Sequence, residues 1–109
     1  MSPDHKPLVW LAMKPKSPPM SLATRTEAGF LLRLLQAGLK VTMPHSRPMP
    51  SIGKRCHELR INDEKCTWRI FYRIDDDVIV IIDLDNKKTT KTTLAKIELC
   101  KARLADYDE

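Results

Sequence analysis

The stretch CHELRINDEKCTWRIFYRIDDDVIVIIDL, residues 56–84, decides the fold of this chain. It holds three runs that are typical of β-strands, at 56–61, 67–74 and 78–84. Short polar connections, NDEK and DDD, separate these runs. Because strands joined by such short connections pair as hairpins, the stretch predicts an antiparallel meander.

Upstream of the meander, the sequence predicts a strand and a helix. The apolar run LVWLAM at 8–13 is followed by a proline-rich segment and predicts a short buried strand. Apolar residues then recur at helical spacing from about Ser21 to Ala37. Thr24 and Glu27 have the spacing of a capping box, and Ser21 is a second N-cap candidate one turn earlier.

A long connection and a second helix complete the order of elements. The segment PHSRPMPSIG at 44–53 contains three prolines and a glycine, which predicts an ordered loop. After the meander, a helix is expected from Thr92 or Thr93 to about Asp106. The predicted fold class is therefore α+β, with a small antiparallel sheet and helices packed on it.

Length and composition favour one domain over residues 1–109, with 1–6 as a flexible tail. The longest apolar runs, at 8–13 and 78–82, are far shorter than the roughly 20 residues of a membrane helix, so no membrane span is expected. The first residues, MSPDHK, lack the apolar core of a signal peptide. We therefore expect a cytoplasmic protein.

Cofactor and metal chemistry find no support in the sequence. The three cysteines, Cys56, Cys66 and Cys100, are odd in number and lack C-x-x-C spacing, which argues against a disulfide framework and a zinc site. The acidic run at 75–77 is typical of a polar hairpin turn. Nucleotide-binding, serine-hydrolase and zinc-protease motifs are absent from the sequence, so we expect neither cofactor nor metal.

The charge distribution points to an anionic partner. The net charge is +5, and the basic residues gather in two segments. Residues 40–73 hold eight basic and three acidic residues, and residues 87–103 hold six basic and one acidic residue. The segment 74–86 between them holds five acidic residues and no basic one. Two basic segments folded onto one face would attract nucleic acid, and the alternative is a basic but inert surface.

Three arginines of the predicted meander are the sharpest candidates for contact with phosphate. Alternation places Arg69 and Arg73 on one face of their strand, and Arg60 lies on the preceding strand. Arginine grips phosphate with two parallel hydrogen bonds and keeps its charge at any accessible pH. The alternative is a solvated sheet face on which these arginines pair with Glu58.

Two further segments offer groups that suit RNA binding. The run KKTTKTT places Lys87, Lys88 and Lys91 directly before a predicted helix, whose N-terminus attracts anions. An ordinary basic turn capped by threonine is the alternative. His45 and Arg47 in the proline-rich loop add a titratable group and another cation.

Together these residues resemble the RelE/HigB superfamily of bacterial toxins, and in particular its phage-derived HigB-like branch. The resemblance runs from Lys6 to about Tyr107, and four motifs carry it: PHSRPMPSI at 44–52, HELRI at 57–61, WRIFYRI at 68–74 and KKTTKT at 87–92. It implies a RelE-like fold and a ribosome-associated mRNA endonuclease that an antitoxin protein holds inactive. It also implies a metal-independent reaction, in which a ribose 2′-hydroxyl attacks its own phosphate.

The resemblance also implies roles for the candidate residues. The three meander arginines would stabilise the negative charge that grows on the phosphorane in the transition state. The three lysines of KKTTKTT would contact the RNA backbone. Tyr107 lies where related toxins often place an aromatic or histidine active-site residue, and it would stack on a base or transfer a proton.

The sequence departs from the branch at Asp85 and Thr93, where its members usually carry phenylalanine and proline. A carboxylate at residue 85 would either weaken phosphate binding or pair with Lys87 and hold it in place. Two alternative functions stay open. One is a ParE-like toxin that binds DNA gyrase and cleaves nothing, and the other is an inactive relative that survives as an RNA- or protein-binding module.

Overall fold

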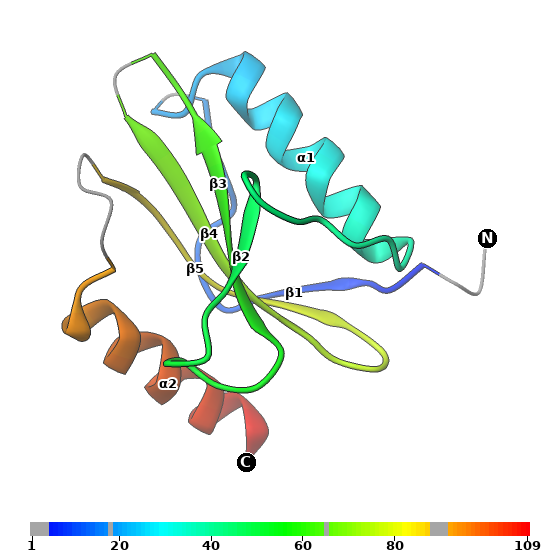
Figure 1. Ribbon diagram of the computed structural model, residues 1–109, viewed down its shortest axis with the longest axis vertical. Helices are drawn as coiled ribbons and strands as arrows, with labels where there is room; N and C mark the ends of the chain where they lie inside the picture. Colours follow the sequence, from blue (N-terminus) through cyan, green and yellow to red (C-terminus); the bar gives the residue numbers. More distant parts are fainter. Residues whose placement is uncertain (1–4, 18, 65, 88–91) are drawn as a thin grey trace.

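Figure 1 shows the computed structural model, which describes residues 5–17, 19–64, 66–87 and 92–109. Five strands and two helices follow one another along these residues. In chain order they are β1 (Leu8–Trp10), α1 (Leu22–Gln36), β2 (Ser46–Pro48), β3 (Cys56–Asn62), β4 (Thr67–Ile74), β5 (Ile79–Lys87) and α2 (Leu94–Asp108). The strands form one sheet in the order β1-β5-β4-β3-β2.

The centre of the sheet is the predicted meander. β4 pairs antiparallel with β3 on one side and with β5 on the other, which confirms this part of the prediction. β5 extends beyond its predicted end, because its ladder with β4 continues to Lys87 opposite Thr67. A β-bulge interrupts that ladder between Phe71 and Tyr72.

β1 makes the sheet mixed. It pairs parallel with β5, with Leu8 opposite Ile79, and its ladder ends when the Leu11 N–H donates to the Ile81 carbonyl at 2.8 Å. The expectation of an antiparallel sheet was therefore wrong at this edge. The direction of an end strand depends on how the intervening chain crosses the sheet, and three residues of local sequence do not record that path.

β2 lies inside the segment that the sequence predicted to be a loop. Ser46 pairs with Leu59 and Pro48 with His57, in antiparallel register. The prediction of a loop over 44–53 was therefore wrong at its centre. Proline is tolerated in this strand because β2 lies at the edge of the sheet, where a missing N–H need not break a ladder hydrogen bond.

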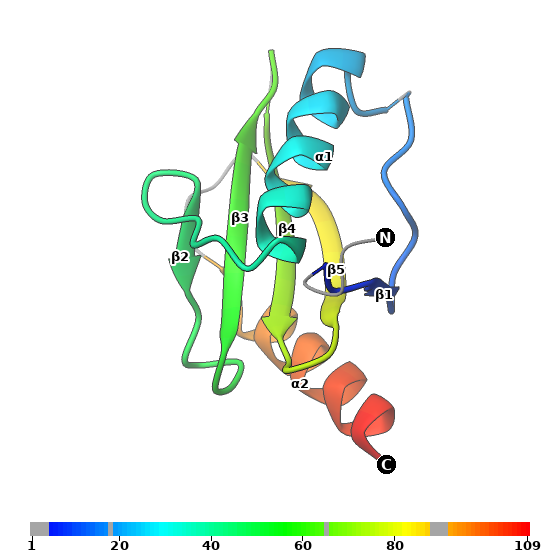
Figure 2. The same ribbon diagram turned by 90° about the vertical axis from the view of Figure 1, so that its right-hand side faces the viewer.

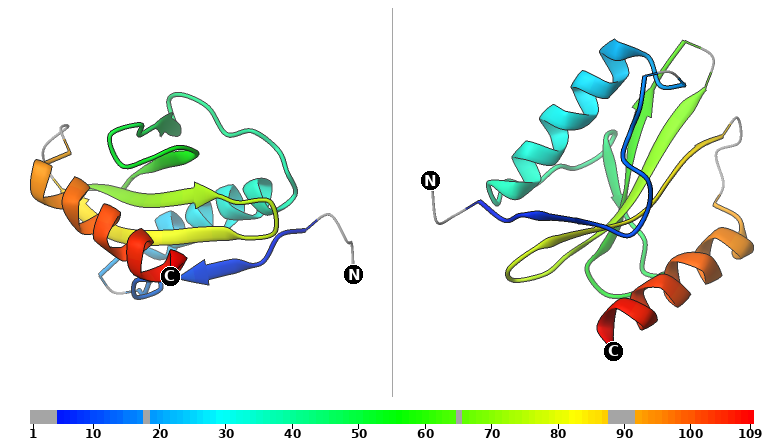
Figure 3. Two further views of the ribbon diagram at one scale, coloured as in Figure 1. Left: turned by 90° about the horizontal axis from the view of Figure 1, so that it is seen from below. Right: turned by 180° about the vertical axis from the view of Figure 1, so that it is seen from behind.

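The two helices cover opposite faces of the sheet (Figures 2 and 3). On the α1 face, helix α1 packs on side chains that include Leu59, Ile70 and Ile81. On the α2 face, helix α2 packs on Phe71 and Val80. Side chains alternate between the two faces along each strand. The face of the meander that packs on α1 is therefore apolar, whereas the opposite face, part of which packs on α2, also carries buried polar side chains.

Each helix begins at a hydroxyl cap. Ser21 is the N-cap of α1, and its Oγ accepts the Thr24 N–H at 3.1 Å. The second of the two predicted caps is therefore the correct one, and Thr24 lies buried inside the first turn, where its hydroxyl donates to the Asn62 carbonyl at 3.3 Å. Thr93 caps α2 by accepting the Lys96 N–H at 3.2 Å, as one of the two predicted starts requires.

Two of the three cysteines are buried. Cys56 and Cys100 lie in the core on the α2 face, and burial raises the pKa of the Cys100 thiol to about 12. Cys66 is partly exposed, and all three thiols are free.

Lys6, the last residue of the expected N-terminal tail, makes two hydrogen bonds with the fold, and residues 1–4 of that tail lie outside the described residues. The Lys6 N–H donates to the Gln36 carbonyl at 2.9 Å, and the Lys6 ammonium donates to the Asp75 carbonyl at 2.7 Å. Within the described parts of the chain, neither helix is long and apolar enough to cross a membrane.

Candidate functional site

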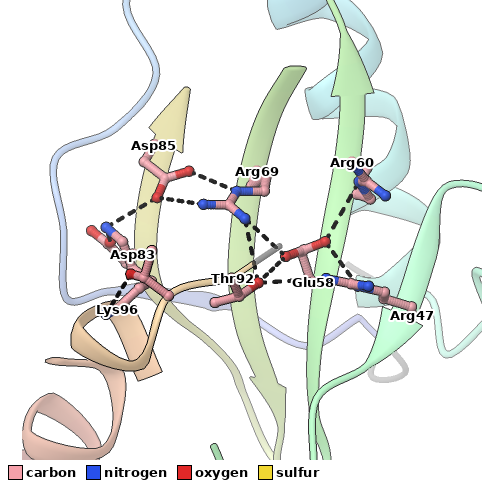
Figure 4. Close-up of polar contacts among 9 residues, drawn as sticks. Arg47, Glu58, Arg60, Arg69, Asp83, Asp85, Thr92 and Lys96 are labelled. Carbon is pink, nitrogen blue, oxygen red and sulfur yellow. Dashed lines mark hydrogen bonds and ion pairs between the residues drawn. The ribbon is translucent and has the colours of Figure 1, made fainter. Parts of the chain in front are cut away.

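Glu58 lies at the centre of a polar group on the α2 face of the sheet (Figure 4). Its side chain is fully buried. Oε1 accepts a hydrogen bond from Arg47 Nε at 3.1 Å, and Oε2 accepts one from the Thr92 hydroxyl at 3.0 Å. A buried carboxylate requires such partners, because removing an unpaired charge from water is strongly unfavourable.

Two arginines of adjacent strands approach the same carboxylate. Arg60 on β3 and Arg69 on β4 are register partners, so both side chains reach the face that Glu58 occupies. Arg60 Nε lies 3.6 Å from Oε1, and Arg69 Nη1 lies 3.7 Å from Oε2. Like charges directly opposite each other across a ladder repel, and the carboxylate of Glu58 offsets this repulsion. We call the following residues the Glu58 cluster: Arg47, Glu58, Arg60, Arg69 and Thr92.

Arg69 links the Glu58 cluster to α2. Its side chain is 1% exposed and holds Asp85 with two hydrogen bonds, from Nε at 3.0 Å and from Nη2 at 3.3 Å. Asp85 also pairs with Lys96 of α2 at 3.1 Å. Lys96 contacts Asp83 as well, and Arg103 reaches Asp83 at 2.9 Å. The network that holds Arg69 therefore also ties α2 to β5.

Lys96 stays charged in this setting. Burial lowers the pKa of its ammonium, but hydrogen bonds to Asp83 and Asp85 outweigh this effect and raise the pKa above its ordinary value. Asp85 thus has two cationic partners among the described side chains, Arg69 and Lys96. These two partners explain how the fold accommodates a carboxylate at residue 85. The sequence alone suggested that this carboxylate would either weaken phosphate binding or pair with Lys87.

The Glu58 cluster has a closed side and an open side. Glu58 and Arg69 are buried, whereas the side chains of Arg47 and Arg60 remain 31% and 26% exposed. Cations outnumber carboxylates in the connected network of described residues, which contains Arg47, Arg60, Arg69, Lys96 and Arg103 against Glu58, Asp83 and Asp85. The open side therefore offers two guanidinium groups, backed by a fixed array of charges, to a phosphate.

Arg73 and Tyr107 belong to a second group, at the end of β4. Arg73 holds Asp75 at 2.8 Å and Asp108 near the end of α2 at 2.8 Å. Its guanidinium carbon lies 5.9 Å from the centre of the Tyr107 ring. The hydrogen bonds that Arg73 donates to Asp108 and Asp75 raise its pKa further above the ordinary value. The structure thus brings Arg60 and Arg69 together and places Arg73 with Tyr107.

His45 lies next to Arg60, beside the Glu58 cluster. The His45 carbonyl accepts the Arg60 N–H at 2.7 Å, and the two residues line a polar pocket of about 370 Å³ together with Glu27 and Asn62. The His45 side chain is exposed beside this pocket.

Of the three candidate lysines, only Lys87 lies within the described residues. Lys87 ends β5, with its backbone opposite Thr67 of β4. Lys88 and Lys91 lie outside the described residues, so their contact with RNA stays a prediction. Thr92, which follows them directly in the chain, donates to Glu58 and accepts hydrogen bonds from Arg47 at 3.4 Å and from Arg69 at 3.3 Å.

Sequence reasoning missed four members of the network, one of which is Asp83. It treated Glu58 only as a partner on a solvated face, whereas Glu58 is the buried centre of the cluster. It did not single out Lys96 or Arg103. Their spacing of seven residues places both on one side of a helix, and this pattern, together with the acids of β5, could have indicated ion pairs between α2 and the sheet.

The arrangement can bind anions without a metal ligand set. Within the part of the chain that the structure describes, no three His, Cys, Asp or Glu side chains are grouped so that they could hold a metal ion. The chemistry that the cluster offers is electrostatic, through guanidinium groups that converge on one place.

Comparisons with known proteins give one match. The family model of the phage-derived Gp49-like proteins (DUF891) matches residues 18–105, which include α1, strands β2 to β5 and α2 except its last three residues. No curated protein and no solved structure matches the chain.

Proposed function

The chain belongs to the Gp49-like family of phage-derived proteins, within the RelE/HigB-like toxin superfamily, and on this premise we propose that it is the toxin of a type II toxin–antitoxin system. It has a RelE-like fold of the HigB-like branch and acts in the cytoplasm as a ribosome-dependent mRNA endonuclease. An antitoxin protein is its partner and inhibitor. The observed mixed sheet with one helix on each face is the architecture to which the proposed RelE-like fold refers.

The observation that carries the proposal is the convergence of three arginines on buried Glu58, with two of them open to solvent. In the proposed reaction the 2′-hydroxyl oxygen of a ribose attacks the adjacent phosphorus, and the bond to the 5′-oxygen of the next nucleotide breaks. The 2′-hydroxyl loses its proton, the leaving oxygen gains one, and a cyclic phosphate remains. Negative charge grows on the phosphoryl oxygens in the transition state.

The roles of the arginines follow from their exposure. Arg47 and Arg60 contact the phosphoryl oxygens, because their side chains are partly exposed to solvent. Arg69 is a positioning residue that acts through Glu58, since its own side chain is buried between Glu58 and Asp85. A fixed array of donors is effective in catalysis because it needs no reorganisation when charge develops.

The other candidates keep supporting roles in the proposal. His45 and the lysines Lys87, Lys88 and Lys91 contact the RNA backbone around the Glu58 cluster. Arg73 and Tyr107, which lie together, stay as predictions for contact with the phosphate and for base stacking or proton transfer. No metal or cofactor takes part in the proposed reaction.

The test is induced expression in a bacterial host, followed by primer extension on abundant mRNAs. The wild type should produce new 5′ ends that depend on translation, and Arg47→Ala/Arg60→Ala should abolish them. Arg25→Ala/Arg33→Ala is the matched control, because it removes two exposed arginines from α1, on the opposite face of the sheet. The two open arginines are a better choice than Arg69, whose loss would disturb the fold.

Other outcomes point to other functions. Growth arrest with intact mRNA, lost in the α1 variant and kept in the cluster variant, would contradict the nuclease proposal and favour a gyrase-binding toxin that uses its helical surface. Absence of growth arrest in the wild type would favour the inactive binding module.

A further inference from the structure

A second surface feature lies on the α1 face, away from the Glu58 cluster. It is an apolar groove of about 540 Å³ between the end of α1, the segment 38–43 and strands β2 to β4. We call it the α1-end groove, and its apolar walls are formed by Leu35, Leu39, Val41, Met43, Pro48 and Ile74. A cavity of this size is large enough for several side chains of a partner.

The floor of the α1-end groove is an aromatic surface. His57 and Tyr72 are neighbours across β3 and β4, and their rings stack with centroids 5.3 Å apart. The Tyr72 hydroxyl is hydrogen-bonded to the Ser46 hydroxyl at 2.6 Å, so its polar end is already satisfied. Burial raises the pKa of Tyr72, and the hydroxyl stays neutral at physiological pH. The floor therefore favours apolar side chains over ordered water.

Large apolar side chains stand at the rim of this groove. Leu39 is 56% exposed and Met43 is 65% exposed, although both line the groove. Single exposed apolar residues are ordinary on protein surfaces, but a pair at the mouth of an apolar groove is typical of an interaction site. Methionine also adapts its shape to different partners.

The charges around the groove select the kind of partner. Lys6 and Lys40 line it, and among its described lining residues none is an aspartate or a glutamate. An acidic segment would complement these lysines. A symmetric contact with a second copy of the chain would instead bring the same lysines together, which is unfavourable.

We propose that the α1-end groove binds an acidic amphipathic segment of a protein partner, with apolar side chains in the groove and carboxylates near Lys6 and Lys40. Given the proposed function, that partner is the antitoxin. The groove opens on the face of the sheet opposite the Glu58 cluster. A segment bound there leaves Arg47 and Arg60 uncovered.

The experiment selects peptides from a displayed library of random sequences on the purified full-length protein. The expected consensus combines spaced apolar residues with aspartate or glutamate. Leu39→Asp/Met43→Asp should weaken binding of the selected peptides by more than about tenfold, because it removes two apolar contacts and adds repulsive charges. Leu22→Asp/Phe30→Asp is the matched control, because it makes the same change at two exposed apolar residues of α1 outside the groove.

Three results would overturn the proposal. Selected peptides without acidic or apolar residues would remove the chemistry on which it rests. Peptides whose binding survives the groove variant and is lost in Arg47→Ala/Arg60→Ala would be ligands of the Glu58 cluster. Self-association in sedimentation, lost in the groove variant, would assign the groove to a second copy. The experiment measures peptide binding and does not use RNA cleavage. Its result can therefore be interpreted even if the nuclease proposal fails.

Discussion

At the scale of single residues, the site depends on charges that the fold has removed from water. Glu58 and Arg69 are both buried, which charged side chains tolerate only when they are paired and hydrogen-bonded. The pairing here is complete, since no buried side-chain nitrogen or oxygen among the described residues lacks a hydrogen-bond partner. Such a network restricts each guanidinium to one orientation.

Replacing Arg69 by alanine should reduce stability strongly. The change leaves Glu58 and Asp85 without a shared buried cation, and breaking a buried ion pair from one side costs about 3–5 kcal/mol. Urea denaturation measures the free energy of unfolding. Arg25→Ala, at an exposed position of α1, is the control and should change it by less than about 0.5 kcal/mol. A loss below about 1 kcal/mol in the Arg69 variant would show that Arg69 is not the structural link described above.

At the scale of elements, two aspartates fix helices to the sheet. Asp63, between β3 and β4, accepts hydrogen bonds from the Ser21 N–H at 3.0 Å and from the Trp68 indole at 3.1 Å. It therefore ties the start of α1 to the hairpin. At the other end of the molecule, Asp108 in the last turn of α2 is held by Arg73 of β4.

The contribution of Asp63 to stability should disappear in acid. Hydrogen bonds from the Ser21 and Glu64 backbone lower its pKa to about 2 from an ordinary value of 3.8. A lowered carboxyl pKa stabilises the folded state above the ordinary pKa, and this stabilisation is lost as pH falls through the folded-state value. The stability difference between wild type and Asp63→Asn should therefore be constant above about pH 5 and shrink between about pH 4 and pH 2. A difference that is independent of pH would contradict this role.

Loss of the Arg73 side chain should free the end of α2. The guanidinium of Arg73 lowers the pKa of Asp108 through hydrogen bonds, so Arg73→Gln should return that pKa toward its ordinary value, as followed by NMR titration. Amide exchange in the last turn of α2 should become faster. If Arg73 only links β4 to α2, the Arg73→Gln variant should still cleave RNA. Loss of cleavage in a variant whose α2 is still ordered would make Arg73 part of the catalytic site.

At the scale of the whole molecule, the fold gathers charges that the sequence separates. Arginines from residues 40–73 and cations from residues 87–103 meet on the α2 face. The acidic segment between them supplies Asp83 and Asp85, which lie inside the same network. The face is therefore cationic at its open side and neutralised where α2 packs.

Binding of single-stranded RNA should weaken as salt increases. Each phosphate that a cation neutralises releases counterions, and contributes about −0.7 to the slope of log K against log salt for single strands. Arg47→Ala/Arg60→Ala should therefore make the slope shallower by about 0.7 for each arginine removed. Fluorescence anisotropy with a labelled RNA oligonucleotide measures it, and Arg25→Ala/Arg33→Ala should leave the slope unchanged. Equal slopes in all three proteins would place RNA elsewhere.

The site could be predicted only in part. Alternation within the WRIFYRI motif placed Arg69 on one face, and the cross-strand register then brought Arg60 beside it. The structure does not group Arg73 with Arg60 and Arg69, because Arg73 pairs with Asp75 and Asp108 at the other end of β4. A strand is long enough to carry two arginines on one face into separate environments.

The sequence by itself determined the meander, both helices and their hydroxyl caps. These features depend on periodicities of two and 3.6 residues and on groups within one turn of each other, so neighbours along the chain encode them. Only the tertiary structure decided the parallel direction of β1, the presence of β2, and the burial of Glu58 between arginines of three strands. Those features depend on hydrogen bonds and ion pairs between residues that are distant in sequence, and local pattern does not specify which distant partner a strand edge or a charge will meet.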